Sequence, residues 1–350
     1  MNVAAPIAST ALKGPQTLAS SWLDYADLLV LVESRMHELA GDRSRDPGAQ
    51  MLREHFDTGG KRLRARLAIA GCQALGGRAA DAVDWAAAVE LIHNASLVHD
   101  DIQDRDRTRR GRPTLWARYG TAQAINAGDL LLMLPFRALR NYPPAMQAAL
   151  IQILAEYGET TARGQIRELG LTASCGNGWG DYFSAASGKT GTLFALPVRG
   201  AAQLAGVSSD AANAIALAFS SIGVLYQLQD DLLDLFDAKG RGTRGSDICE
   251  GRLSAVLLTH LDLHPDDAQA TFEIIGKPRE QTTPWEVEQM IQRFIDGGAA
   301  EQLRSRIRAL ATDLLSSERL VASPQMQAIA RELVHLVLAP LDQAKGSERD

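Results

Sequence analysis

The stretch LVHDDIQDRDRTRRGRPT, residues 97–114, places a dense acidic cluster directly before a dense basic one. The acidic residues are Asp100, Asp101 and Asp104, and the basic residues that follow are Arg107, Arg109, Arg110 and Arg112. Because residues four apart lie on one face of an α-helix, Asp100 and Asp104 point the same way and repel each other. A helix that carries this pair therefore needs a positively charged partner.

A second acidic cluster repeats the D-D-x-x-D spacing in YQLQDDLLDLF, residues 226–236, with Asp230, Asp231 and Asp234. A solvated acidic face is the ordinary explanation for one such cluster. However, the segments just before the two clusters, residues 90–98 and 214–229, are apolar and should be buried. Two clusters at the inner ends of buried helices indicate that the carboxylates face a cavity.

Oxygen ligands without His or Cys suit Mg²⁺, which binds one or two carboxylates and completes its shell with water and phosphate. Basic groups follow the glycine pair of GGKRLRARL, where Lys61, Arg62 and Arg64 stand at an expected helix start that favours anions. The segment GKTGTLF adds Lys189 and Thr190. Carboxylates, Mg²⁺ and cations around an apolar cavity predict a substrate with a diphosphate head and an apolar tail.

The composition excludes several other classes of protein. Among 350 residues, 46% are hydrophobic and 22% charged, and the net charge of −6 argues against a nucleic-acid partner. The widely spaced Cys72, Cys175 and Cys249 fit neither a disulfide framework nor a zinc site, which favours a cytoplasmic location. No apolar run reaches membrane-spanning length, so no membrane span is expected.

Apolar residues recur at helical spacing along most of the chain, and strand-like alternation is almost absent. This pattern predicts an all-α fold, a single large helical bundle around a central apolar cavity. Residues 1–20 are expected to form a flexible lead and residues 21–345 the helical domain. The expected helices include residues 122–140, 144–169, 181–205, 209–236, 252–260, 284–316 and 323–344.

Five motifs occur in an order that resembles the trans-isoprenyl diphosphate synthases, or polyprenyl synthetases, and most of all the geranylgeranyl diphosphate synthases. The motifs are GGKRLR, HNASLVHDDIQD with RRGRPT, AGDLLL, GKTGTLF, and QLQDDLLD followed by GSDICEGR. The resemblance covers roughly residues 59–254. The resemblance implies the isoprenoid synthase fold, Mg²⁺ as cofactor and a homodimer.

The resemblance also implies a role for individual residues. The isopentenyl diphosphate head would be held by Lys61, Arg64, His93 and Arg110. Two Mg²⁺ ions would bind Asp100 and Asp104 and a third Asp230, with Asp101, Asp231 and Asp234 completing the acidic motifs. The allylic substrate would contact Arg109, Lys189, Thr190 and Gln227. Simpler alternatives are a core histidine for His93, a surface lysine for Lys189 and a local backbone cap for Gln227.

The sequence departs from the family pattern after the second acidic cluster. A Gly-Lys pair is usual five or six residues before the Asp of GSD, whereas Arg241 and Gly242 stand here, with Arg244 nearby. Arg252 replaces the lysine of the usual EGK. Arg and Lys bind phosphate with different geometry. The sequence therefore leaves open which of these arginines takes the place of the family's lysine at the allylic site.

The implied reaction is the head-to-tail condensation of isopentenyl diphosphate with an allylic diphosphate. A longer-chain polyprenyl synthase, a class I terpene cyclase and a non-catalytic subunit are the alternatives. A cyclase should lack the isopentenyl site and have an altered second metal motif, and a non-catalytic subunit should have lost acidic or basic groups. Both DDLLD and GGKRLR are present, which favours the synthase.

The residues one turn before Asp100 bear on product length. They are Ala95 and Ser96, and in this family a bulky aromatic residue there stops chain growth early. Both are small, so growth should pass the fifteen-carbon stage. Deeper candidates for a tunnel floor are Leu91 and Ile92, with Met133 and Phe136 expected to face them. This floor favours a twenty-carbon product, geranylgeranyl diphosphate.

Overall fold

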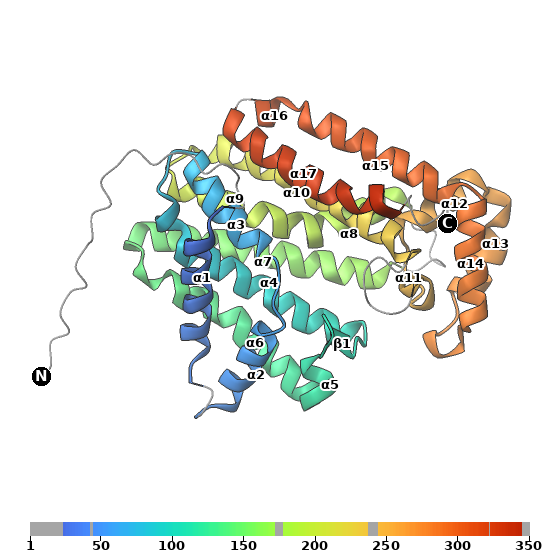
Figure 1. Cartoon of the computed structure of the whole chain (residues 1–350), viewed down its shortest axis with the longest axis horizontal. Coiled ribbons are helices and arrows are strands. Elements are labelled where there is room, and N and C mark those ends of the chain that lie inside the picture. Colours follow the sequence, from blue (N-terminus) through green and yellow to red (C-terminus); the bar gives the residue numbers. More distant parts are fainter. Residues whose placement is uncertain (1–23, 43–44, 172–177, 237–243, 322, 345–350) are drawn as a thin grey trace, which may run out of the picture.

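The computed structural model describes residues 24–42, 45–171, 178–236, 244–321 and 323–344, and these form an almost entirely helical bundle (Figure 1). The predicted all-α fold is confirmed. The expected lead over residues 1–20 lies outside the described residues. The first half contains α1 (Ala26–Ala40), α2 (Pro47–Phe56), α3 (Leu63–Ala74), η1 (Ala79–Ala82), α4 (Val83–Gln103), α5 (Leu115–Tyr119), α6 (Thr121–Ala138), η2 (Leu139–Asn141) and α7 (Pro144–Gly170).

The second half continues in the same way. It contains α8 (Trp179–Ala186), η4 (Ser187–Gly191), α9 (Thr192–Leu204), α10 (Ser209–Asp234), α11 (Ser246–Cys249), α12 (Ala255–Leu263), η5 (Pro265–Asp267), α13 (Ala268–Ile275), η6 (Arg279–Gln281), α14 (Pro284–Asp296), α15 (Ala299–Leu315), α16 (Glu318–Val321) and α17 (Pro324–Ala344). A short hairpin joins β1 (Thr108–Arg109) to the antiparallel β2 (Arg112–Pro113).

Helix α4 is the spine of the first half and packs against α1, α3, α6 and α9. Near its start, Trp85 is fully buried, and its indole Nε1 donates to the carbonyl of Pro197 in α9 at 3.0 Å. The indole lies where a side chain at Gly200 would otherwise stand. Together these features draw α4 and α9 close together and set the position of the acidic cluster at the far end of α4.

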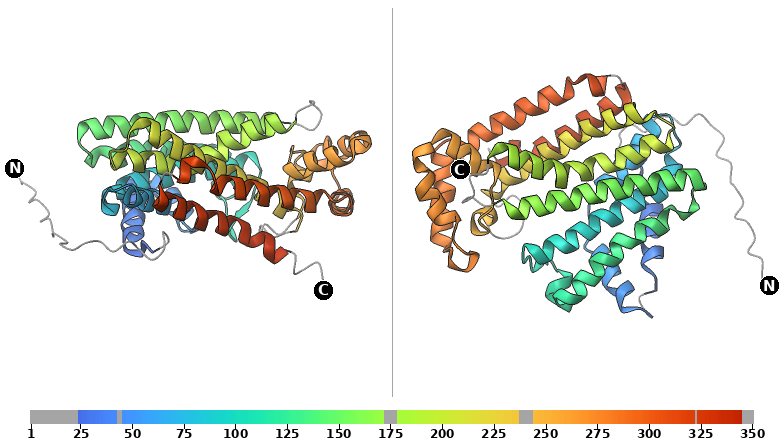
Figure 2. Two further views of the ribbon diagram at one scale, coloured as in Figure 1. Left: turned by 90° about the horizontal axis from the view of Figure 1, so that it is seen from above. Right: turned by 180° about the vertical axis from the view of Figure 1, so that it is seen from behind.

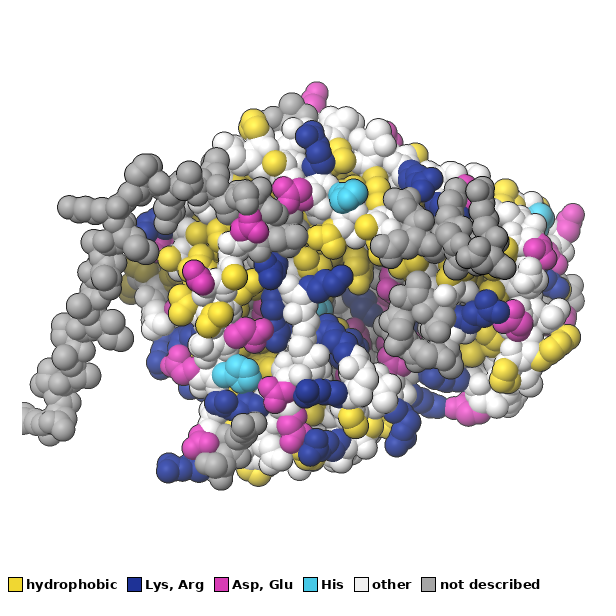
Figure 3. Space-filling model, in the orientation of Figure 1, with side chains coloured by type: hydrophobic (Ala, Val, Ile, Leu, Met, Phe, Trp, Pro, Cys, Tyr) yellow, Lys and Arg dark blue, Asp and Glu magenta, His cyan; other side chains and the backbone are white. Residues whose placement is uncertain are grey.

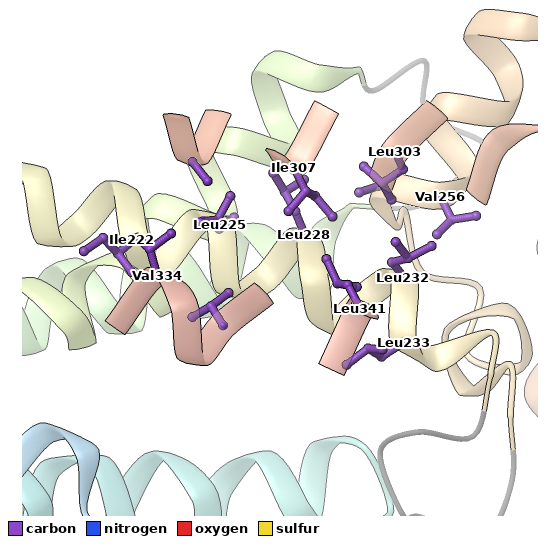
Figure 4. Close-up of a cluster of buried hydrophobic side chains, with 14 of the residues drawn as sticks. Ile222, Leu225, Leu228, Leu232, Leu233, Val256, Leu303, Ile307, Val334 and Leu341 are labelled. Atoms are coloured by element: carbon purple, nitrogen blue, oxygen red, sulfur yellow. The ribbon is translucent and has the colours of Figure 1, made fainter. Parts of the chain in front are cut away.

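Helix α10 is the spine of the second half and packs against α9, α15 and α17. Figure 4 shows its buried side chains, among them Ile222, Leu225 and Leu228, against Ile307 of α15 and Val334 of α17. Among the described residues, α10 is the helix that is long and apolar enough to cross a membrane. Because 56% of its most apolar window is buried in the protein, we assign α10 as a core helix.

Figure 2 shows α7 alongside α9, while α12, α13 and α14 gather at one end of the molecule. The C-terminal ends of α4 and α10 both reach the segment between α11 and α12. Arg252 of that segment bonds to Asp104 at the end of α4, and the backbone N–H of Ala255 donates to Asp231 of α10. The two acidic clusters are thereby brought to the same region.

Two predicted helices are interrupted. The helix expected over residues 181–205 contains a π-helical turn, η4, between α8 and α9. The helix expected over residues 284–316 is wrong as a single element, because α14 ends at Asp296 and α15 begins at Ala299. Gly298 between them has φ 79°, a left-handed conformation that ends a helix and that glycine adopts without strain.

Candidate active site

A cavity of about 860 Å³ lies between the C-terminal halves of α4 and α10. Figure 3 shows a hollow in this face of the molecule, with Lys and Arg side chains around it and acidic side chains inside. The predicted site residues in its wall are Lys61, Arg64, His93, Ser96, Asp100, Asp104, Arg109, Arg110, Lys189, Thr190, Gln227 and Asp230. Ala95, Asp101, Asp231 and Asp234 are buried and lie outside this wall.

The two cavity-facing carboxylates of the first cluster each have a basic partner. Lys189 Nζ lies 3.6 Å from Asp100 Oδ1, and Arg252 bonds to Asp104. Burial raises the pKa of Asp100, while Lys189 opposes that shift. Burial lowers the pKa of Lys189, but Asp100 and Glu168 outweigh it and the pKa is raised overall. Without a bound substrate, the acidic pair is therefore neutralised by cations of the same cavity.

Asp101 points away from the cavity and holds Arg109. Its Oδ1 accepts a hydrogen bond from Arg109 Nε at 2.8 Å and lies 2.7 Å from Arg109 Nη2 in an ion pair. Burial raises the pKa of Asp101 to about 6, although Arg109 opposes the shift. The hairpin of β1 and β2 thus directs an arginine back toward the acidic cluster, and Asp101 orients that arginine.

In the second cluster, Asp230 faces the cavity while Asp231 and Asp234 anchor the chain. Asp231 accepts from Tyr182 Oη at 2.8 Å, the backbone N–H of Ala255 at 2.8 Å and Gln227 Nε2 at 2.9 Å.

Asp234 accepts from Ser246 Oγ at 2.5 Å and from the backbone N–H of Asp247 at 3.0 Å. These contacts and those of Asp231 fasten residues 246–255 to the end of α10. Both buried carboxylates therefore have a structural role in support of the site.

A second basic group stands at the start of α3. Arg64 Nη1 lies 3.0 Å from His93 Nε2, and the Arg64 guanidinium covers the ring of Phe194 at 5.1 Å. Burial lowers the pKa of His93, and Arg64 lowers it further, so the ring is neutral and accepts at Nε2. Arg64 Nε is buried without a protein partner. His93 lines the cavity beside a buried guanidinium, which favours the site role over the core-histidine alternative.

Lys61 and Arg110 complete this basic group. Lys61 precedes α3 and is exposed at the cavity, while Arg110 has φ 52° in the turn of the hairpin. Arg110 donates to the carbonyl of Gly59, so the hairpin and the glycine pair are in contact. The glycine pair and the hairpin, about fifty residues apart in the sequence, therefore present their cations to one side of the cavity.

The structure adds residues that the sequence did not single out. Glu168, near the end of α7, bonds to Lys189. Both Glu168 and Asp247 line the cavity. Glu250 forms ion pairs with Arg252 Nε at 2.7 Å and Arg279 Nη1 at 3.0 Å, and burial raises its pKa to about 7. Glu168 stands alone in α7, and an isolated acidic residue gives no sequence signal of a site. Asp247 and Glu250 lie within the motif GSDICEGR, but the sequence pattern gave neither residue a role of its own.

The positions of the arginines partly answer which of them takes the place of the family's lysine at the allylic site. Arg252 lines the cavity and bonds to Asp104, whereas Arg244 pairs with Glu288 on the exposed surface at 2.5 Å. Arg241 lies outside the described residues. Of the two described arginines, Arg252 is the one within the site.

The predicted tunnel floor is wrong in part. Leu91 and Ile92 are buried, but Met133 and Phe136 are 57% and 37% exposed on the outer side of α6. The buried residues of α6 are instead those such as Leu131 and Leu134. Helix α6 has apolar residues on both faces, so apolarity alone did not identify the face that meets α4.

Carboxylates of both acidic motifs line one cavity together with two sets of cations. The family model for polyprenyl synthetases matches residues 47–294. The chain belongs to the polyprenyl synthetase family. As a polyprenyl synthetase it is a prenyltransferase with the isoprenoid synthase fold.

Similar proteins support this membership. The polyprenyl synthetase is 33% identical over 253 residues to a short chain isoprenyl diphosphate synthase of Methanothermobacter thermautotrophicus, covering 71% of this chain and 77% of that one. It is 30% identical over 286 residues to a geranylgeranyl pyrophosphate synthase of Geoglobus acetivorans, covering 81% and 87%. The crystal structure of a Caulobacter crescentus polyprenyl synthase complexed with calcium and isoprenyl diphosphate superimposes with a TM-score of 0.76 and 26% identity, over 93% of this chain and 99% of that one.

The two kinds of acidic residue should respond differently to mutation. Asp231→Ala leaves the buried donors of Tyr182 and Ala255 without a partner, which should lower the free energy of unfolding by about 1–3 kcal/mol for each donor. Asp230→Ala should stop turnover with a far smaller loss of stability. Urea unfolding followed by circular dichroism measures both, and a wild-type midpoint for Asp231→Ala would contradict the anchoring role.

Proposed function

We propose that this polyprenyl synthetase condenses isopentenyl diphosphate with an allylic diphosphate in an Mg²⁺-dependent reaction and releases geranylgeranyl diphosphate. The observation that carries the proposal is the cavity in which Asp100 of α4 and Asp104, just after α4, face Asp230 of α10, with cations on both sides. The names of the similar proteins from Geoglobus acetivorans and Methanothermobacter thermautotrophicus support a product of this length class.

The donor set fits Mg²⁺. Asp100, Asp104 and Asp230 supply carboxylate oxygens, the ligand type that Mg²⁺ prefers. Among the described residues, no three acidic, His or Cys side chains form a cluster able to hold a metal ion alone. This favours Mg²⁺ ions whose remaining ligands are water and substrate phosphate. The family resemblance implies three such ions. When bound, Mg²⁺ neutralises charge that develops on the leaving diphosphate.

The two sets of cations suit two diphosphates. Lys61, Arg64 and Arg110, with neutral His93, form the proposed isopentenyl side. The proposed allylic side consists of Arg109, Lys189, Thr190, Gln227 and Arg252. The allylic cations now pair with the carboxylates of the first motif, so substrate binding would exchange those partners for the diphosphate. Fixed cations of this kind stabilise the charge that builds up as the allylic C–O bond breaks.

The cavity wall also contains apolar side chains, including Leu97, Leu193 and Leu233. These would hold the allylic chain against the double bond of isopentenyl diphosphate, and positioning of this kind supplies much of the rate. They also keep water from the reactive allylic cation. The departing diphosphate, held by Lys189 and Arg252, is the proposed acceptor of the proton that is finally lost.

A terpene cyclase is the second enzyme considered, and it would need no isopentenyl site. The Arg64–His93 pair in the cavity wall therefore favours the synthase. A non-catalytic subunit is also disfavoured, because Asp100, Asp104 and Asp230 all line the cavity. A cytoplasmic location remains a prediction from the cysteine pattern.

Activity should depend on metal and on all three cavity-facing carboxylates. Incubation with isopentenyl diphosphate, farnesyl diphosphate and Mg²⁺ should give geranylgeranyl diphosphate, identified by mass spectrometry. EDTA should stop the reaction and added Mg²⁺ should restore it, because the carboxylates alone leave the diphosphate charge uncompensated. Asp100→Asn should also stop the reaction, and added Mg²⁺ should not restore it. Undiminished turnover in EDTA, or a cyclic product from the allylic substrate alone, would contradict the proposal.

Product length should depend on Ser96. Of the two residues predicted to form the tunnel wall, Ser96 lines the cavity, whereas Ala95 is fully buried behind it. Ser96→Phe should therefore shorten the main product to farnesyl diphosphate, because the ring would occupy the path of the growing chain. Chromatography of the products measures this, with Ser96→Ala as the size control. An unchanged product from Ser96→Phe would rule out Ser96 as part of the tunnel wall.

The family resemblance implies a homodimer, and α6 offers a surface for it. Ile125, Met133 and Phe136 lie at helical spacing and are 37–57% exposed. Exposed apolar clusters of this kind mark interfaces. Phe136→Asp should convert a dimer to a monomer in light scattering. Leu310→Asp on α15, where the leucine is also 37% exposed, is the control that should leave the mass unchanged. A monomeric wild-type protein would contradict the homodimer.

A further inference from the structure

Lys189 and Thr190 lie on a turn with unusual geometry. The π-helical turn η4 joins α8 to α9, and the backbone N–H of Thr192 donates to the carbonyl of Ser187, five residues back. The Thr192 hydroxyl donates to the same carbonyl at 3.1 Å. A π turn is wider than an α turn, so successive side chains diverge less. Two consecutive residues, Lys189 and Thr190, can therefore line the same cavity.

Glycine makes close contact possible on one side of the turn. Helix α7 crosses η4 at Gly164, which lies directly against Gly188. A Cβ placed on Gly164 would come within 3.0 Å of the backbone of Gly188 and Lys189, a separation that real Cβ atoms essentially never show. A Cβ on Gly188 would lie 2.9 Å from the Cα of Gly164. Any side chain at Gly164 would thus push η4 away from α7.

The same arrangement occurs on the other side of the turn. Helix α10 meets η4 at Gly223, and a Cβ there would lie 2.7 Å from the Cα of Gly191 and 2.8 Å from the carbonyl oxygen of Thr190. The π turn is therefore held between α7 and α10 by backbone contact on both sides. Its position has little freedom as long as glycine occupies both crossing points.

Each crossing helix also provides a partner one turn beyond its glycine. Glu168 follows Gly164 by four residues and bonds to Lys189 Nζ. Gln227 follows Gly223 by four residues, and its Oε1 accepts from Thr190 Oγ1 at 2.9 Å. Residues four apart lie on one helix face. The close contact at each glycine therefore sets how near Glu168 lies to Lys189 and how near Gln227 lies to Thr190. The backbone contacts at the two glycines and the side-chain bonds to Lys189 and Thr190 therefore depend on each other.

We propose that Gly164 and Gly223 are positioning residues for the allylic diphosphate: they let α7 and α10 close on η4 so that Lys189 and Thr190 reach the cavity. This inference rests on the proposed function. Neither glycine touches substrate, and both act through the π turn. The competing explanation is that the glycines serve only the packing of the bundle, in which case a substitution would lower stability without preference for one substrate.

The test is Gly164→Ala in a steady-state assay with each substrate varied in turn. Relief of the clash needs a shift of about 1 Å, since ordinary carbon contacts lie at about 3.5–4.0 Å. A misplacement of about 1 Å can reduce kcat/KM about 100-fold, and this loss should appear for the allylic diphosphate. The KM for isopentenyl diphosphate should stay unchanged, because Arg64 and His93 lie on other elements.

Two further variants make the result specific. Gly158→Ala lies on the same helix with open space around its Cβ, so it should keep wild-type kinetics and serves as the matched control. Gly188→Ala introduces a milder clash at the same contact and should give a smaller loss in the same direction. If Gly164→Ala fails to fold, as judged by circular dichroism, the Gly188→Ala variant replaces it. A raised KM for the allylic diphosphate supports the inference, and an unchanged KM contradicts it.

A double-mutant cycle separates positioning from packing. If Gly164 acts through Lys189, the Gly164→Ala change should reduce allylic kcat/KM far less in a Lys189→Ala background than in wild type. Equal losses in both backgrounds, or equal KM increases for the two substrates, would overturn the inference. An inactive wild-type enzyme would instead contradict the proposed function, so the two failures are distinguishable.

Discussion

The need to neutralise buried carboxylates organises this molecule. The first acidic cluster lies at the end of an apolar helix, where like charges would repel one another and lose hydration. Each of its acids is paired with a cation from a different part of the chain. The pairs are Lys189 with Asp100, Arg109 with Asp101 and Arg252 with Asp104. The π turn, the hairpin and the segment between α11 and α12 are thus brought together at the cavity that we propose as the active site.

The two D-D-x-x-D motifs look alike in the sequence, but their aspartates have different roles in the two motifs. In the first, two carboxylates face the cavity and one orients an arginine. In the second, Asp230 faces the cavity, while Asp231 and Asp234 bind backbone and hydroxyl donors of residues 246–255. The buried acids hold in place the segment that carries Arg252. The acidic motif proposed to bind metal therefore also holds two parts of the chain together.

The long helices could be predicted because each buries a stripe of apolar side chains at a regular spacing. The interruptions could not be predicted in the same way. The split between α14 and α15 depends on two adjacent glycines, and glycine also occurs inside helices such as α10. The π turn at η4 depends on backbone contact with α7 and α10. The outward position of Met133 depends on which face of α6 meets α4, and an apolar residue does not specify its partner.

The sequence by itself determined the all-α class, the two acidic motifs, the cations that accompany them and membership of the polyprenyl synthetase family. These follow from local spacing, since helix periodicity and motif order are properties of neighbouring residues. Only the tertiary structure decided which acids face the cavity, that Arg252 and not Arg244 lies in the site, and that Glu168 belongs to it. Those facts depend on contacts between helices far apart in the chain, where burial and charge pairing select one arrangement among many that local patterns allow.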